Sequence, residues 1–302
     1  MKPGERSMQS IQSDQVIGNQ YSPDDGFKTA ARLHQCKYRA EILNVDYVDY
    51  GNRLTVADGR KLLNYYEGLN VHEILRQRYP KYSNKRDADM LRSEHIPFNF
   101  FAPLVNRPAL AEQVLNNIIS KRFYSPLRLE FEWAPKPAEN YLDDNTSFDT
   151  YIEARDEHGK LTGIGIEVKY TERGYPIGRT EKKRVNDSNS LYWKVTRNSK
   201  AFNNNDTEVL AQNNLRQIWR NHLLGLSMIQ AGKIDQFVLI TIYPSGNRYI
   251  AESISRYQDL LTNEAKIGCL GVTFEDYFAG IEGDSDILKW KEYLENRYIV
   301  KP

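Results

Sequence analysis

The feature that most limits how this chain of 302 residues can fold is one uninterrupted apolar run, Phe237–Tyr243. Its sequence is Phe-Val-Leu-Ile-Thr-Ile-Tyr, so a strand formed here has no polar face to turn toward water. Runs of this kind are typical of a central strand that is covered on both faces. The chain therefore needs packing layers on both sides of a sheet.

The segments around this run predict those layers. Alternating residues predict three strands, a helical period predicts the helices, and Pro108 suits the first position of a helix. The order of helix, three strands, helix and strand indicates an α/β domain over residues 107–302. The predicted elements are helices over 108–121, 207–230, 247–261 and 285–297, and strands over 128–133, 147–155, 163–171, 237–243 and 271–274.

The part before this domain divides into two predicted regions. Residues 1–26 are polar and lack an apolar period, so we expect a flexible arm. Residues 27–106 are expected to form an N-terminal helical region. Its clearest helix is predicted over Asp58–Tyr79, and Ser83 is a plausible N-cap for a second helix that ends at Arg92.

Composition excludes several classes of protein. The chain has 41 basic and 40 acidic side chains and a net charge of +1. Its overall charge therefore does not indicate a nucleic-acid partner. Cys36 and Cys269 are too few for a disulfide scaffold or a thiolate zinc site. No apolar stretch is long enough to cross a membrane, and the first twenty residues lack the apolar core of a secretion signal. We therefore expect a cytoplasmic protein without a membrane partner.

The second and third predicted strands carry the most informative side chains. The turn residues Asp156–Lys160 join them, and a hairpin centred on His158 places Asp149 opposite Glu167. The same register gathers apolar residues on the other face, which a shift of one residue would undo. Glycines beside the carboxylates are expected to leave the sheet surface open there. The apolar set is Phe148, Ile152, Ile166 and Val168, and the glycines are Gly163 and Gly165.

Two carboxylates that face each other across a ladder repel, and a divalent cation removes the repulsion. Mg²⁺ prefers hard oxygen ligands from one or two carboxylates, completed by water and phosphate oxygen. Lys169 shares the face of Glu167, so it is placed to polarise a water molecule or to stabilise charge on a phosphate. A solvated strand face is the structural alternative.

Asp149, a hairpin and Ile166-Glu167-Val168-Lys169 together resemble the metal-binding motif of the PD-(D/E)XK nuclease superfamily. The wider context is similar to a bacterial branch of it, over roughly residues 90–300, although Phe148 stands where the motif has Pro. The resemblance implies a restriction-endonuclease-like core, with a central mixed β-sheet flanked by helices. It also implies a Mg²⁺-dependent deoxyribonuclease in which Mn²⁺ substitutes. Asp149, Glu167 and the Val168 carbonyl would bind the metal, and Lys169 would be the catalytic lysine.

The superfamily often adds polar residues from two helices. A glutamate from the first core helix has three candidates, Glu94, Glu112 and Glu132, of which Glu94 ranks first on its sequence context. The later helix offers Gln217, which shares a face with Asn221 four residues on. We predict Glu94 and Gln217 as further catalytic residues.

A basic segment follows the motif. Residues 173–200 contain eight basic and two acidic side chains, with Tyr175, Tyr192 and Trp193 interleaved. Such a loop is placed to hold a phosphate backbone and to stack on bases, while a solvated charged loop is the alternative. The predicted nucleic-acid contacts are Lys182, Lys183, Arg184, Lys194 and Arg197, together with Arg220 on the later helix.

Two other functions stay open at this point. A non-catalytic DNA-binding or complex-forming module would keep the fold, but it would be free to lose Asp149, Glu167 or Lys169. A glycosidase would use paired carboxylates, but an ammonium beside them suits a general acid poorly. The resemblance suggests bacterial defence or DNA processing. It leaves open a homo-oligomer or a partner protein of a defence complex.

Overall fold

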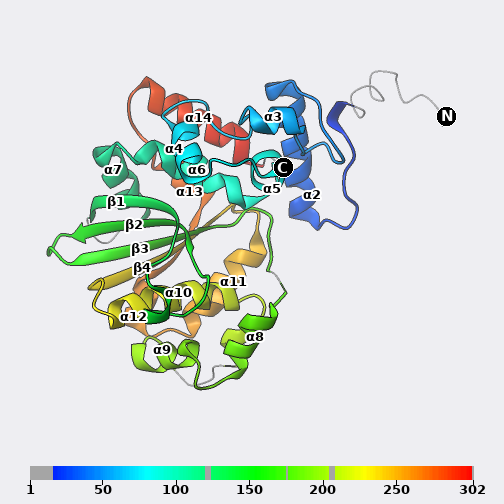
Figure 1. The fold of residues 1–302 in the computed structure, drawn as a ribbon. Coiled ribbons are helices and arrows are strands. Elements are labelled where there is room, and N and C mark those ends of the chain that lie inside the picture. The colour runs from blue at the N-terminus through cyan, green and yellow to red at the C-terminus, as the bar shows by residue number, and fades with distance from the viewer. Residues whose placement is uncertain (1–15, 120–123, 175, 204–207, 301–302) are drawn as a thin grey trace. The chain divides into compact units, whose positions relative to one another are not determined.

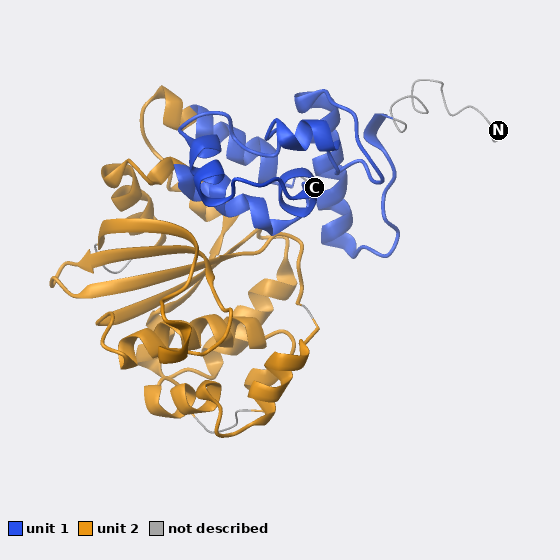
Figure 2. Ribbon diagram, viewed as in Figure 1, with its two compact units in different colours: residues 1–102, 289–302 blue, residues 103–288 orange. Residues whose placement is uncertain are grey.

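The computed structural model describes residues 16–119, 124–174, 176–203 and 208–300. The chain divides into two compact units, residues 1–102 with 289–302 and residues 103–288 (Figure 2). The predicted boundary lay between residues 106 and 107, whereas the first unit ends at residue 102 and also includes the last fourteen residues. The cause is burial of the C-terminal helix there. Trp290 and Tyr298 are fully buried, and the Trp290 indole donates a 2.8 Å hydrogen bond to the Asn99 carbonyl.

The first unit is the predicted helical extension. Its described helices are α2 (Gly26–Lys37), α3 (Val56–Arg60), α4 (Val71–Arg78), α5 (Asn84–Ala88), α6 (Ile96–Phe101) and the larger part of α14 (Ser285–Tyr298). The predicted arm over residues 1–26 is too long at its C-terminal end. Asp25 caps α2, and Asp24 is held 2.6 Å from Arg32. Residues 1–15 of that arm lie outside the described residues.

The single helix predicted over Asp58–Tyr79 is wrong. The structure has α3 and α4 instead, and the backbone between them turns through left-handed conformations at Leu62, Leu69 and Asn70. Such φ values end a right-handed helix. The helix expected up to Arg92 also ends early, at Ala88, because the backbone beyond it pairs with residues 52–54.

The second unit is built on a mixed sheet of five strands in the order β1-β2-β3-β4-β5. The first three pair antiparallel, whereas β4 runs parallel to β3 and to β5. About 49% of the chain is helical, and the whole is a restriction-endonuclease-like α/β fold. The strands are β1 (Tyr124–Trp133), β2 (Phe148–Asp156), β3 (Leu161–Val168), β4 (Gln236–Tyr243) and β5 (Cys269–Thr273).

Helices cover both faces of this sheet, as the apolar strand β4 requires. Figure 1 shows α10 on one side and α7 and α13 on the other. The basic segment predicted to be a loop forms two helices, α8 and α9, and α10 begins later than predicted, at Arg216. The remaining bounds are α7 (Pro108–Ile118), α8 (Arg179–Asn186), α9 (Leu191–Ser199), α10 (Arg216–Gln230), α11 (Arg248–Asp259), α12 (Asn263–Ile267) and α13 (Phe274–Ala279).

The predicted register of the β2–β3 hairpin is confirmed. Thr150 pairs with Ile166 and Ile152 pairs with Ile164, as a hairpin centred on His158 requires. The ladder ends at Thr150, and beyond it the Asp149 carboxylate accepts the Val168 N–H at 2.7 Å. A side chain therefore replaces the backbone partner at the end of the strand.

Two expectations about the faces of this hairpin are wrong. Phe148 was expected beside Ile152, but beyond the end of the ladder its ring stacks 5.9 Å from Tyr151, over Gly165. A methyl group added at Gly165 would lie 2.5 Å from that ring. The glycines therefore do not leave the sheet surface open. They make room for the aromatic rings that fill the core under α10.

Candidate active site

Glu167 lies at the end of β3, and three side chains donate hydrogen bonds to its carboxylate. Only 7% of the residue is exposed. Its Oε1 accepts hydrogen bonds from Lys169 Nζ at 2.7 Å and from the Gln217 amide, and its Oε2 accepts one from Asn221 Nδ2 at 2.8 Å. One donor from the residue after β3 and two from α10 therefore fix the position of this carboxylate.

Asp149 faces this group from β2. Burial and the charges of Glu167 and Glu132 raise the pKa of Asp149 well above its ordinary value, against the opposing effects of Lys169 and the Val168 N–H. An ionised Asp149 is therefore unfavourable unless more positive charge is brought to the site. A cation bound by both carboxylates would supply that charge.

Lys169 stands next to the strand end with 15% of its side chain exposed. Burial lowers the pKa of an ammonium, but the charges of Glu167, Asp149 and Glu172 outweigh burial and raise the pKa of Lys169 above its ordinary value. The side chain therefore stays charged at neutral pH. It can donate hydrogen bonds and stabilise negative charge.

Helix α10 brings two amides to the site. Gln217 and Asn221 are four residues apart and both donate to Glu167, as expected of side chains that share one helix face. Gln217 was predicted as a site residue, whereas Asn221 was not. Its spacing from Gln217 was the signal that identified it as a neighbour.

The three candidate glutamates lie in different places. Glu132 is the one whose charge acts on Asp149, and its left-handed φ of 48° turns the end of β1. Glu112 accepts a 3.1 Å hydrogen bond from Ser125, and Ser125 pairs with Arg155, six residues along β2 from Asp149. That is roughly 20 Å at the usual rise of a strand, so Glu112 is not part of this site.

Glu94, which ranked first, belongs to the first unit. It lies in the 3₁₀ turn Ser93–His95, is about half exposed, and its carboxylate is 3.8 Å from Arg92. Its catalytic role remains a prediction.

The basic segment differs most from its prediction. Arg220 is 3.2 Å from the buried carboxylate of Glu181 on α8, and so is Arg216. Arg184 bonds the Asp143 carbonyl. Lys182, Lys183, Lys194 and Arg197 are exposed. The Glu181 cluster, with Arg216 and Arg220, was not predicted, because a carboxylate within a basic run gives no sign of its partners.

The aromatic residues of this segment do not offer a surface for bases. Tyr192 and Trp193 are buried, with ring centres 5.5 and 4.6 Å from that of Trp219 on α10. The Trp193 indole also donates to the Val185 carbonyl at 2.7 Å. Their predicted stacking role is therefore wrong, since they form the core that joins α9 to α10. Tyr175 lies outside the described residues.

The donors at the strand ends fit a divalent cation. Among the described residues, no three His, Cys, Asp or Glu side chains are grouped as a complete metal site. Two carboxylates and the Val168 carbonyl are nevertheless hard oxygen donors, and Mg²⁺ needs only one or two carboxylates when water completes its shell. The raised pKa of Asp149 indicates that the site lacks enough positive charge to balance its carboxylates. The residues present therefore fit a divalent cation.

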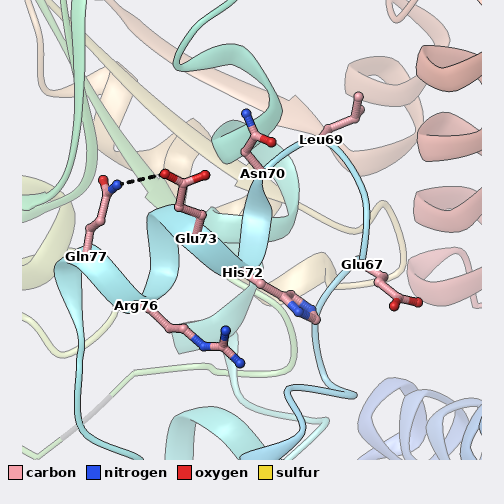
Figure 3. Close-up of a pocket in the computed structure, with 7 residues that line it drawn as sticks. All are labelled: Glu67, Leu69, Asn70, His72, Glu73, Arg76 and Gln77. Atoms are coloured by element: carbon pink, nitrogen blue, oxygen red, sulfur yellow. Dashed lines mark hydrogen bonds between the residues drawn. The ribbon is translucent and has the colours of Figure 1, made fainter.

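A hollow on the first unit does not suit this chemistry. Figure 3 shows its lining side chains along α4 and the loop before it, where Gln77 donates to Glu73 at 3.2 Å. The hollow has two carboxylates, Glu67 and Glu73, and only one guanidinium, Arg76, so it would repel a phosphate. The lining residues are Glu67, Leu69, Asn70, His72, Glu73, Arg76 and Gln77.

The mixed sheet flanked by helices is the fold of restriction-endonuclease-like nucleases. The chain matches the sequence model of the PD-(D/E)XK nuclease superfamily over residues 22–300 and belongs to that superfamily. Membership indicates nuclease activity, and its members usually use divalent metals. The match begins at residue 22, so it includes residues before 90, which the sequence resemblance left out. Comparison with curated proteins and with solved structures finds no significant match.

None of the described helices is long and apolar enough to cross a membrane.

Proposed function

We propose that the protein is a deoxyribonuclease that hydrolyses phosphodiester bonds with the help of Mg²⁺. The observation that carries the proposal is the bonding of Glu167. Its carboxylate is buried next to Asp149 and is held by Lys169, Gln217 and Asn221. A structural carboxylate at a strand end needs no such arrangement, whereas a metal ligand benefits from it.

Asp149, Glu167 and the Val168 carbonyl would hold the cation, with Mn²⁺ able to replace Mg²⁺. When bound, such an ion polarises a phosphoryl oxygen and lowers the pKa of a bound water molecule. The residues of the chain divide the remaining work. Lys169 presents a positive charge to the water or to the phosphate, and the amides of Gln217 and Asn221 keep the Glu167 carboxylate in one orientation.

DNA is proposed as the substrate because exposed cations follow the catalytic strand. Lys182 and Lys183 lie on α8, and Lys194 and Arg197 lie on α9. Exposed lysines and arginines of this kind neutralise phosphates without reading sequence. Arg184 and Arg220 stay in the proposed contact set, although each also has a partner in the protein. Bacterial defence or DNA processing is the proposed setting.

A plasmid-cleavage assay tests the proposal. We expect cleavage with Mg²⁺ or Mn²⁺, none with EDTA, and none in the Glu167→Gln variant. The Glu264→Gln variant removes an exposed carboxylate on α12 and is the matched control. Binding of DNA without cleavage under every metal condition would favour the alternative, a non-catalytic DNA-binding or complex-forming module.

The third carboxylate is tested in the same assay. Glu94→Gln and Glu132→Gln are compared, because Glu94 has the sequence context and Glu132 has the electrostatic contact with Asp149. We propose Glu94 as predicted. Loss of cleavage in the Glu132 variant alone would reassign the role to Glu132.

A further inference from the structure

The first unit carries a concentration of positive charge that the proposed active site does not use. Between residues 56 and 85, six basic side chains are exposed and only two carboxylates, Glu67 and Glu73, are exposed with them. The chain as a whole is nearly neutral, with a net charge of +1. The excess is therefore local. The six exposed basic residues are Arg60, Lys61, Arg76, Arg78, Lys81 and Lys85.

Tyr82 brings the two ends of this segment together. The Arg60 guanidinium of α3 lies 5.7 Å from the centre of its ring, and the ring packs against Gly59. The Tyr82 hydroxyl donates to Asn84 at the start of α5, at 2.9 Å. Arg60 therefore lies beside Lys81 and Lys85, although more than twenty residues separate them in the chain.

Tyr79 contacts two arginines of this segment. The guanidinium groups of Arg78 and Arg86 lie 4.8 and 4.1 Å from the centre of its ring. Arg86 is buried and is 2.8 Å from Asp87, which therefore neutralises this inner cation and not the outer ones. Among the described residues, no ion pair joins Arg60, Lys81 or Lys85 to a carboxylate.

We propose that this surface binds the phosphate backbone of a nucleic acid. The α3–α5 basic surface consists of Arg60, Arg78, Lys81 and Lys85 around Tyr79 and Tyr82. Contact with the Tyr82 ring orients the Arg60 guanidinium without cancelling its charge, so Arg60 stays available to a phosphate.

The choice of nucleic acid as the partner rests on the proposed function, but the site does not include the catalytic carboxylates. The surface would give the enzyme a second binding site for its substrate, and binding there would require no metal. Its contribution should therefore appear in binding measured with EDTA and in KM, while kcat at saturating DNA stays unchanged.

The test is the salt dependence of DNA binding by the full chain in EDTA. The variant Arg60→Gln, Lys81→Gln, Lys85→Gln removes three charges from the surface. The control Lys37→Gln, Lys233→Gln, Lys266→Gln removes three exposed charges from α2, the turn before β4 and α12. We expect the slope of log K against log salt to fall by about two to three for the variant and to stay unchanged for the control, since each phosphate contact contributes about 0.9.

A parallel variant separates this inference from the proposed function. Charge reversal at Lys182 and Lys183 weakens the contact proposed for the second unit. If that variant loses binding and the Arg60 variant does not, the inference is wrong and the proposed DNA substrate stands. If the wild-type chain does not bind DNA at all, both are wrong. A variant that unfolds is replaced by Lys81→Gln, Lys85→Gln, which removes only exposed side chains without ion pairs.

Discussion

At the scale of single residues, the two oxygens of Glu167 are not equivalent. Oε1 accepts from Lys169 and Gln217, whereas Oε2 accepts from Asn221 alone. A metal ion that binds this carboxylate must share it with those donors. Because Asn221 is only 2% exposed, its amide acts on the orientation of the carboxylate and does not reach solvent.

Replacing Asn221 should therefore weaken the metal site without removing a ligand. For Asn221→Ala we expect a loss of about 10- to 100-fold in Mn²⁺ affinity by calorimetry, the scale for residues that orient a metal ligand. Asn221→Asp should lose more, because a second negative charge would lie 2.8 Å from Glu167. The control is Gln230→Ala, an amide on the same helix that donates to the Val195 carbonyl. Unchanged affinity in both Asn221 variants would show that the amide is only structural.

The residues that sequence reasoning placed correctly share one property, a strict local pattern. Asp149, Glu167 and Lys169 follow from strand alternation and one turn centre. Phe148 was misplaced because the ladder ends one pair early, at Thr150. The partners of Arg220 could not be foreseen, since Glu181 lies thirty-nine residues earlier in the chain.

At the scale of elements, ion pairs attach α8 to α10, the helix that carries Gln217 and Asn221. Glu181 is buried on α8, and its Oε1 is 3.2 Å from both Arg216 and Arg220 of α10. The exposed Lys182 and Lys183 are its immediate neighbours. The ion pairs therefore couple the placement of the proposed DNA contacts to the placement of Gln217 and Asn221.

Breaking this cluster should affect both stability and substrate binding. Glu181→Gln removes the negative charge that lies 3.2 Å from the guanidinium of Arg216, whose side chain is only 4% exposed. We expect a loss of about 3 kcal/mol in the free energy of unfolding, measured by urea titration, as for other buried pairs broken on one side. KM for DNA should rise with it. Glu264→Gln is again the exposed control, and a change no larger than that of the control would contradict the role of Glu181.

Helix α10 also carries a buried titratable group. His222 donates to or accepts from the Tyr257 hydroxyl at 2.9 Å, and burial lowers the pKa of His222 to about 4. Because an unfolded histidine binds a proton near pH 6.5, the neutral ring stabilises the fold above that pH. This stability is lost as the pH falls from about 6.5 toward 4.

The pH dependence of unfolding tests this point. The free energy of unfolding should fall by about 3 kcal/mol between pH 6.5 and 4 from this residue, given 1.36 kcal/mol per pKa unit. The His222→Gln variant should lack that part of the slope, whereas His158→Gln, which changes an exposed histidine, should keep it. An identical pH profile in wild type and His222→Gln would rule out His222 as the cause.

Element prediction succeeded where apolar residues recur regularly and failed where they do not. The strands and α7 followed from alternation, from a continuous apolar run and from Pro108. Helices α8 and α9 were missed because their buried residues are few and mixed in type, with Glu181 and Thr196 among them. The helix predicted over Asp58–Tyr79 rested on the spacing of leucines. That spacing gave no sign of the left-handed turns between α3 and α4.

At the scale of the whole molecule, a nearly neutral chain carries separate basic regions. One lies on α8 and α9, and the other is the α3–α5 basic surface. The family match spans residues 22–300, so both units belong to what the family shares. The grouping of the C-terminal helix with the first unit was beyond prediction, since the bond between Trp290 and Asn99 joins residues 191 positions apart.

The central claim is that Asp149 and Glu167 bind a divalent metal while Lys169 acts on the reacting groups. Calorimetric titration of Mn²⁺ into Glu167→Gln and Lys169→Ala, with plasmid cleavage measured on the same samples, tests it most directly. We predict that Glu167→Gln binds no Mn²⁺ and cleaves no DNA. Lys169→Ala should still bind the ion yet lose roughly 10²-fold in rate, the scale for one transition-state donor. Tight Mn²⁺ binding and full cleavage by Glu167→Gln would contradict the account.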